Sequence, residues 1–125
     1  MLLRLTTVFF VLFLMCFVLL QYGQANPHEK VSSSKLKSFT KINTNWEQQG
    51  KQLITVFTFN SGFKGAVNFV QRLVKPADQM NHHPDVGISY NKVTISLTTH
   101  DADGITNADL ALAEVIQKLY ASIKK

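Results

Sequence analysis

The sequence predicts an α+β domain of two layers, with a four-stranded, largely antiparallel sheet that carries its helices on one face. Two observations support this class. Segments rich in Ile, Val, Thr and Phe occur as two strand-like pairs, and each pair is followed by a segment whose apolar residues have helical spacing. Strands so close in the sequence pair most simply as antiparallel neighbours, and the few helices suffice to cover one face.

The first 25 residues are predicted to be a secretory signal peptide. Residues 5–20 form an apolar run behind a single charge, Arg4, and small residues precede a candidate cleavage site after Ala25. The run is short for a membrane-spanning helix, which needs about 20 residues. An uncleaved membrane anchor is the alternative. We therefore expect a secreted or periplasmic protein that has no contact with a membrane after cleavage.

A flexible lead-in is expected next, over residues 26–35, where Pro27 and three consecutive serines indicate irregular chain. The domain is then predicted to span residues 36–125, which is enough for one hydrophobic core. The only cysteine, Cys16, lies in the predicted leader. The domain must therefore be stable without disulfides.

The first half of the domain is predicted to contain two strands and a helix. Residues 45–49 form a short strand, and Gly50 turns the chain into a stronger strand over residues 51–59. A helix follows and ends near Pro76, because proline interrupts helical hydrogen bonding. Its apolar residues form one stripe at spacings of three and four: Phe63, Val67, Val70 and Val74.

The second half repeats this order after a loop that contains histidines. Residues 88–99 are predicted to be one strand or two, with a break at Asn91. In its second part apolar and polar residues alternate. The apolar residues Val93, Ile95 and Leu97 are predicted to lie on one face, and the polar residues Thr94, Ser96 and Thr98 on the other. The last helix begins near Asn107. Its buried side is expected to contain Leu112, Ile116, Leu119 and Ile123.

The charge of the chain argues against direct binding of nucleic acid. The net charge is +5 at pH 7, but the basic residues are scattered, with no run of five like charges. Only Arg72 remains in the domain to grip phosphates or bases as arginine does.

Three histidines are the candidates for chemistry: His82, His83 and His100. Imidazole titrates near neutral pH and can therefore give or take a proton during a reaction. Pro84 biases His83 away from helix. His100 is expected to end the strand on its polar face, in register with Thr94, Ser96 and Thr98, where a pocket for a small molecule is plausible.

Each candidate also has a structural interpretation. Adjacent histidines in a loop are more often surface residues than catalytic ones. Asp109 matches a capping box with Thr106 at the N-cap, and Asp78 is either a partner for His82 or solvated charge. The three histidines with Asp78, Asp85 or Asp101 could form a zinc site, although neighbouring side chains in extended chain diverge.

Taken together, the spacings resemble the signature of the pterin-4a-carbinolamine dehydratases. The pattern is Asp78, three residues, His82-His83-Pro84, five residues, Tyr90, nine residues, His100, eight residues, Asp109. The resemblance extends over residues 34–122.

This resemblance implies a small α+β domain that assembles as a homodimer or homotetramer through sheet edges and helices. It implies dehydration of a 4a-hydroxytetrahydropterin to a quinonoid dihydropterin, with no metal and no organic cofactor. His82 and His100 would be the catalytic acid and base. His83, Pro84 and Tyr90 would bind the small-molecule pterin or support its pocket. Asp78 and Asp109 would orient histidines.

Two features depart from the family's usual pattern. Many relatives have an aromatic residue shortly after the acidic one, whereas Asp85 is followed here by Val86 and Gly87. The family's usual task is intracellular, which conflicts with the predicted leader. Two other hypotheses therefore stay open: a non-catalytic module of the same fold that binds pterin or another protein, and a metal-dependent hydrolase.

Overall fold

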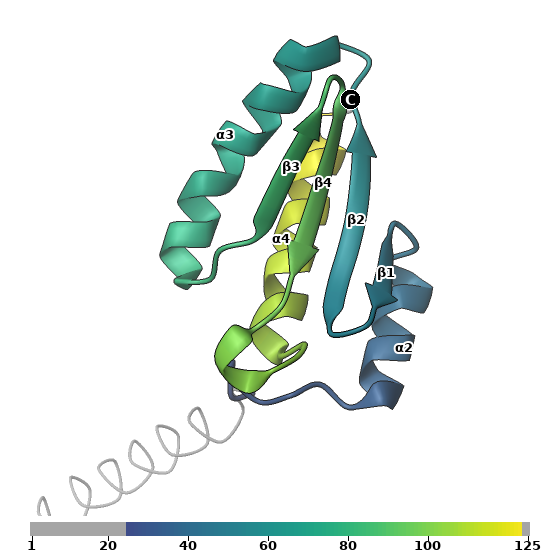
Figure 1. Cartoon of the computed structure of the whole chain (residues 1–125), viewed down its shortest axis with the longest axis vertical. Coiled ribbons are helices and arrows are strands. Elements are labelled where there is room, and N and C mark those ends of the chain that lie inside the picture. Colours follow the sequence, from purple (N-terminus) through teal and green to yellow (C-terminus); the bar gives the residue numbers. More distant parts are fainter. Residues whose placement is uncertain (1–24, 124–125) are drawn as a thin grey trace, which may run out of the picture.

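A four-stranded antiparallel sheet forms one layer of the domain, with its strands in the order β1-β2-β4-β3 (Figure 1). The computed structural model describes residues 25–123. The strands are β1 (Trp46–Gln49), β2 (Gln52–Thr58), β3 (Asp85–Ser89) and β4 (Lys92–Leu97), and the helices are α2 (Ser33–Ile42), α3 (Gly62–Met80) and α4 (Asn107–Ile123). The predicted α+β class is confirmed. The predicted signal peptide lies outside the described residues, apart from Ala25.

The helices cover the face of the sheet that carries the buried side chains of β2 and β4. In β2 the buried positions are Leu53, Thr55 and Phe57, and in β4 they are Val93, Ile95 and Leu97. Cross-strand pairing puts them on one face, since Leu53 lies opposite Leu97 and Phe57 opposite Val93. Figure 1 shows α4 behind the sheet, α3 beside the β3 edge and α2 beside β1.

Aromatic rings join the two layers at the centre of the core. Phe57 of β2 stacks on Tyr120 of α4 with ring centroids 4.1 Å apart, and it meets Phe69 of α3 edge-on at 5.5 Å. Tyr120 also donates a hydrogen bond from its hydroxyl to the carbonyl oxygen of Thr58. One strand and both long helices are thus fixed at the same point.

The predicted flexible lead-in is wrong at its C-terminal end, because residues 33–35 belong to a helix that the sequence did not predict. The side chain of Ser32 caps α2 by accepting a hydrogen bond from the backbone N–H of Lys35. The helix then buries Leu36 and Phe39 against the core. Three consecutive serines suggested irregular chain, but one of them acts as the N-cap.

The segment before α2 is also held in place. The N–H of Val31 donates to the carbonyl oxygen of Ile105, and the N–H of Ala108 donates to that of Pro27. The side chain of Asn107 donates to the carbonyl oxygen of Asn26. Residues 26–31 are therefore tied to the start of α4.

Helix α3 differs from its prediction in length and in orientation. It continues through Pro76 to Met80, since Ala77 is buried and Met80 packs against the core. Its buried residues are Gly65, Ala66, Phe69, Leu73 and Ala77. In the stripe that predicted the helix, only Val70 packs against the core, whereas Phe63, Val67 and Val74 are exposed.

The second pair of strands forms a hairpin that starts earlier than predicted. β3 begins at Asp85, and the chain reverses at Tyr90, whose φ is 51°, and at Asn91 before β4 begins. Helix α4 begins at Asn107 as predicted, with Leu112 and Ile116 buried and Leu119 and Ile123 packed against the core. These α4 contacts confirm its predicted buried side.

An exposed ion pair joins the turn between β1 and β2 to the segment that follows β4. Lys51 Nζ lies 2.5 Å from Asp103 Oδ2. The hydrogen bond from Lys51, and then the charge of Lys51, hold the pKa of Asp103 below its ordinary value of 3.8. Asp103 has a left-handed φ of 52°, which aspartate adopts more readily than most residues.

Candidate acid-base site

The end of α3 sets the position of His82. Asn81 caps the helix in a left-handed conformation, with φ 47°, and its backbone N–H donates to carbonyl oxygens of the last turn. The N–H of His82 then donates to the carbonyl oxygen of Ala77. His82 is thereby turned back toward the start of α4, and its side chain is only 14% exposed.

Asp109 is the partner of His82. It lies in the first turn of α4 and its side chain is fully buried. His82 Nε2 lies 2.6 Å from Asp109 Oδ1. A carboxylate at the N-terminus of a helix is stabilised by the helix dipole, and a buried carboxylate needs hydrogen bonds on both oxygens.

The second oxygen of Asp109 is held by two threonines. Asp109 Oδ2 accepts a hydrogen bond from the backbone N–H of Thr106 at 2.7 Å and one from the hydroxyl of Thr99 at 2.8 Å. The two threonine hydroxyls lie 2.7 Å from each other. The capping-box interpretation of Asp109 is therefore correct for Oδ2, while Oδ1 holds the histidine.

Sequence reasoning used Thr106 only as a helix cap and missed Thr99 as part of this site. Thr99 is buried, and it exchanges backbone hydrogen bonds with Gly104 across a short loop. This loop brings Thr99 to Thr106 and Asp109. The only sequence signal was that Thr99 directly precedes His100.

His83 has a separate and exposed partner. Its Nε2 lies 2.9 Å from Oδ1 of Asp78, and the two side chains are 61% and 66% exposed. The hypothesis that Asp78 contacts a histidine agrees with this geometry, but that histidine is His83 and not His82. Pro84 is half-buried and leads directly into β3.

His100 lies at the same end of the sheet but not within a strand. β4 ends at Leu97, and His100 begins a single turn of 3₁₀ helix, His100–Ala102. The expectation that it ends the strand in register with Thr98 is therefore wrong, because the chain turns after Thr99. His100 is exposed, and its ring accepts or donates no hydrogen bond within residues 25–123.

Tyr90 is not brought to the histidines. It forms the turn between β3 and β4, at the end of the hairpin opposite Asp85, and it is 72% exposed. Its hydroxyl packs near Gly62 at the start of α3, where an added Cβ would lie 3.3 Å from it. Five strand residues, at about 3.3 Å each, separate it from Pro84.

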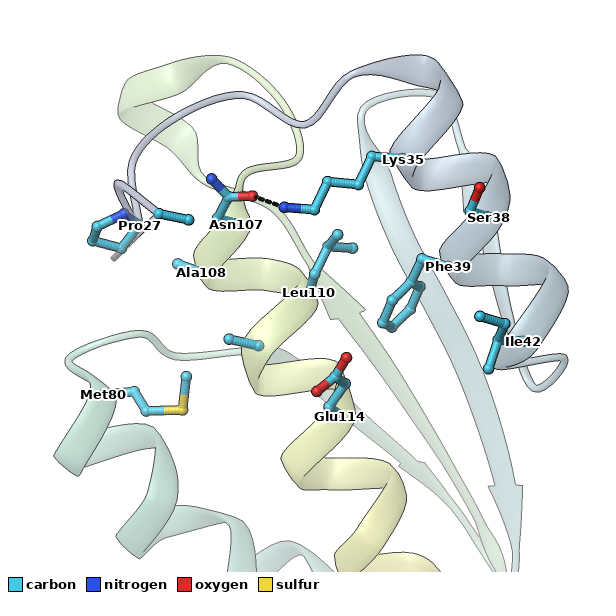
Figure 2. A pocket seen from close by; sticks show the side chains of 12 residues that line it. Pro27, Lys35, Ser38, Phe39, Ile42, Met80, Asn107, Ala108, Leu110 and Glu114 are labelled. Atoms are coloured by element: carbon cyan, nitrogen blue, oxygen red, sulfur yellow. Dashed lines mark hydrogen bonds between the residues drawn. The ribbon is translucent and has the colours of Figure 1, made fainter. Parts of the chain in front are cut away.

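A separate groove lies away from the histidines (Figure 2). It has a volume of about 590 Å³ and lies over α4, between α2 and the end of α3. Phe39, Ile42, Met80 and Leu110 give it an apolar wall, and Lys35 bonds to Asn107 at its rim. None of the three histidines lines this groove.

The zinc hypothesis receives no geometric support from the part of the chain that the structure describes. There, no three side chains of His, Cys, Asp or Glu come close enough together to hold a metal ion. The carboxylates next to His82 and His83 are each engaged with a single histidine.

The fold is α+β, and comparison with known proteins shows the family of the chain. Residues 29–119 match the family described as pterin 4 alpha carbinolamine dehydratase. The chain belongs to this family.

Two relatives show the extent of the similarity. A protein of Thermosynechococcus vestitus is 46% identical over 91 residues, which cover 73% of this chain and 95% of the relative. A protein of Sulfurisphaera tokodaii is 43% identical over 91 residues, covering 73% of this chain and 97% of the relative. Both have the provisional name pterin-4-alpha-carbinolamine dehydratase.

Two solved structures share the fold. A transcriptional coactivator/pterin dehydratase from Brucella melitensis has a TM-score of 0.69 at 22% identity, over 74% of this chain and 99% of that one. A pterin dehydratase-like protein, described as a RuBisCO assembly factor in the α-carboxysome, has a TM-score of 0.52 at 23% identity, over 61% and 89%. At these identities the likeness concerns the fold alone.

The predicted secreted or periplasmic location is wrong. The two relatives above are covered almost completely by 91 residues of this chain, so their similarity gives no support to an export leader. Among residues 25–123, no helix is long and apolar enough to cross a membrane.

Proposed function

We propose that this protein dehydrates a 4a-hydroxytetrahydropterin to a quinonoid dihydropterin and water, with His82 and His100 as the acid-base residues. The observation that carries the proposal is the 2.6 Å contact between His82 and the buried carboxylate of Asp109. A carboxylate in this position orients an imidazole and stabilises its protonated form, as general acid-base catalysis requires.

The reaction needs two proton transfers and no redox partner. The C4a–O bond breaks as the hydroxyl is protonated and leaves as water, the C4a=N5 double bond forms, and N5 loses its proton. Hydroxide is a poor leaving group, so an acid near neutrality accelerates the step while a base accepts the N5 proton. Positioned acid-base groups typically contribute about 10²–10⁴-fold.

His83 and Pro84 are proposed to bind and position the pterin. His83 is exposed and can reach a ligand, and Asp78 restrains its ring through the 2.9 Å contact. We propose no role for Tyr90 in substrate binding, because it lies at the other end of the hairpin. The space next to Val86 is open, since a Cβ at Gly87 would meet no atom within 4 Å.

A non-catalytic interaction module is the second candidate. The exposed apolar stripe of α3, formed by Phe63, Val67 and Val74, favours contact with another protein surface. The names of the two structural neighbours include a transcriptional coactivator and an assembly factor. We propose that this stripe joins copies of the chain into a homodimer or homotetramer, which is compatible with catalysis.

The deciding experiment is turnover of a synthetic 4a-hydroxytetrahydropterin by the purified full-length chain, followed by ultraviolet absorbance. We expect acceleration by the wild type and by His28→Ala, which removes an exposed side chain that is hydrogen-bonded neither to Asp109 nor to His82. The double variant His82→Ala/His100→Ala should be inactive, although its circular dichroism spectrum should show a folded chain. A folded wild type that fails to exceed the buffer rate would refute the enzyme proposal and leave the interaction module.

A further inference from the structure

The hydrogen bonds around Asp109 run in one direction. Asp109 Oδ2 accepts from the backbone N–H of Thr106 and from the hydroxyl of Thr99. The Thr106 hydroxyl lies 3.2 Å from the same oxygen, farther than the Thr99 hydroxyl at 2.8 Å. We therefore assign the Thr99 proton to Asp109, and the Thr106 proton to the 2.7 Å contact between the two threonine hydroxyls. Thr106 thus donates to Thr99, and Thr99 donates to Asp109.

This arrangement leaves a single oxygen of Asp109 for His82. Oδ2 already accepts two short hydrogen bonds, and Oδ1 has His82 Nε2 as its partner. A carboxylate only accepts hydrogen bonds, so Nε2 of His82 must carry the proton. A neutral imidazole carries one proton on only one of its two nitrogens. Because Nε2 holds that proton here, Nδ1 of a neutral His82 has none.

From these contacts we propose that Thr99 is a positioning residue, and that His82 takes the N5 proton of the substrate through Nδ1. This inference rests on the proposed dehydratase function and deepens it. Nδ1 of His82 has no hydrogen-bond partner within residues 25–123, and the ring is partly exposed, so this atom is available to a ligand. The proton leaves N5 and binds Nδ1, while Asp109 stabilises the resulting imidazolium.

Thr99 also connects the two proposed acid-base residues. It is buried, its hydroxyl holds Asp109, and its carbonyl carbon is bonded to the nitrogen of His100. The backbone hydrogen bonds between Thr99 and Gly104 fix the 3₁₀ turn that contains His100. Thr99 therefore links the orientation of the His82–Asp109 pair to the position of His100 in the turn that follows β4.

The first test reads the tautomer of His82 in the free protein and needs no substrate. Nitrogen-15 chemical shifts of histidine rings distinguish a protonated Nε2 from a protonated Nδ1, and the signals of His82 are those that a His82→Gln variant lacks. In alkaline buffer, where an imidazole ring carries a single proton, we expect a protonated Nε2 and a bare Nδ1. A protonated Nδ1 in the wild type would overturn the proposal.

The second test compares three threonine variants of the full-length chain. Thr99→Val keeps the shape of the side chain but removes its hydroxyl, and kcat should fall about tenfold, as expected for one hydrogen bond to a charged group, while KM stays within about twofold. Thr99→Ser should restore kcat to within about twofold of the wild type. Thr98→Val is the matched control, because the Thr98 hydroxyl donates to the carbonyl oxygen of Lys51 and not to Asp109.

The two tests separate this inference from the proposed function. Without the Thr99 hydroxyl the Asp109 carboxylate should turn away from Nε2 in part of the molecules, and His82 should then show a mixture of tautomers, which a merely structural role would not produce. An unchanged kcat in Thr99→Val, or an equal loss in Thr99→Ser, would refute the positioning role. A wild type with the expected tautomer but no turnover would refute the dehydratase proposal and leave the hydrogen-bond direction established.

Discussion

Asp109 divides its two carboxylate oxygens between His82 and the start of its own helix. Oδ1 lies 2.6 Å from His82 Nε2, while Oδ2 accepts the N–H of Thr106 at 2.7 Å. The same side chain therefore caps α4 and orients the candidate catalytic ring. Loss of its charge should affect both stability and activity.

Asp109→Asn is expected to separate these two roles. If the amide oxygen keeps the bonds to Thr99 and Thr106, the amide nitrogen faces His82 and donates to Nε2, which forces the proton onto Nδ1. We expect kcat to fall by about 10²–10⁴-fold with the fold retained. Steady-state kinetics together with circular dichroism would check this. A kcat within threefold of the wild type would contradict the role assigned to the His82–Asp109 pair.

His83→Ala should differ from the change at His82. His83 is 61% exposed and is paired only with the equally exposed Asp78, so its removal costs little stability. If it binds and positions the pterin, KM should rise several-fold while kcat changes less. Kinetics over a range of substrate concentrations would measure both. A loss confined to kcat would instead place His83 in the proton transfer.

Whether the sequence predicts a contact of this site depends on how many residues separate the two partners. The contact between Asp109 and Thr106 spans three residues, and the capping-box pattern predicts it locally. The contact between Asp109 and His82 spans 27 residues and depends on how α3 ends and α4 begins. Only resemblance to the family suggested it. Asp78 pairs with His83 because the backbone turns at Asn81. Tyr90 lies far from the histidines because it forms the turn between β3 and β4 itself.

Antiparallel pairing was predicted correctly where paired strands are adjacent in sequence. The buried side of α3 was predicted wrongly, because two stripes of this helix fit a buried face equally well. Helix α3 has two stripes with spacings of three and four, one through Phe63 and Val67, the other through Phe69 and Leu73. Periodicity alone cannot say which stripe faces the sheet. Gly65 lies on the buried side and allows close approach, since a Cβ added there would lie 3.1 Å from the Cβ of Phe59, the residue that follows β2.

Phe69→Ala is expected to destabilise the domain strongly. Phe69 is fully buried and contacts the rings of Phe57 and Tyr120. Removing a buried phenylalanine typically costs about 3–5 kcal/mol of unfolding free energy. Gln71→Ala, on an exposed position of the same helix, should change it by less than about 0.5 kcal/mol. Urea unfolding would measure both. Equal effects would contradict the orientation of α3.

The ion pair between Lys51 and Asp103 should make a small contribution that depends on pH. The pKa of Asp103 in the folded state lies below its ordinary value of 3.8. The ion pair therefore stabilises the fold above that pH, and this stabilisation is lost as the pH falls through the lowered pKa. Asp103→Asn isolates the charge, because asparagine also tolerates the left-handed φ of 52°. We expect the variant to be less stable than the wild type at pH 7 and equally stable in strong acid. A difference that persists unchanged in acid would assign the effect to something other than the ion pair.

The exposed stripe of α3 is expected to control assembly. Phe63 and Val74 are each 56% exposed on α3, where contact with a second copy would remove them from water. If copies of the chain associate through this stripe as proposed, introducing charges there with Phe63→Lys/Val74→Lys should lower the mass measured by light scattering without unfolding the chain. Ile42→Lys is the control, since Ile42 is an exposed apolar residue of the separate groove over α4. If this control dissociates the oligomer and the α3 variant does not, the groove, and not α3, is where copies of the chain meet.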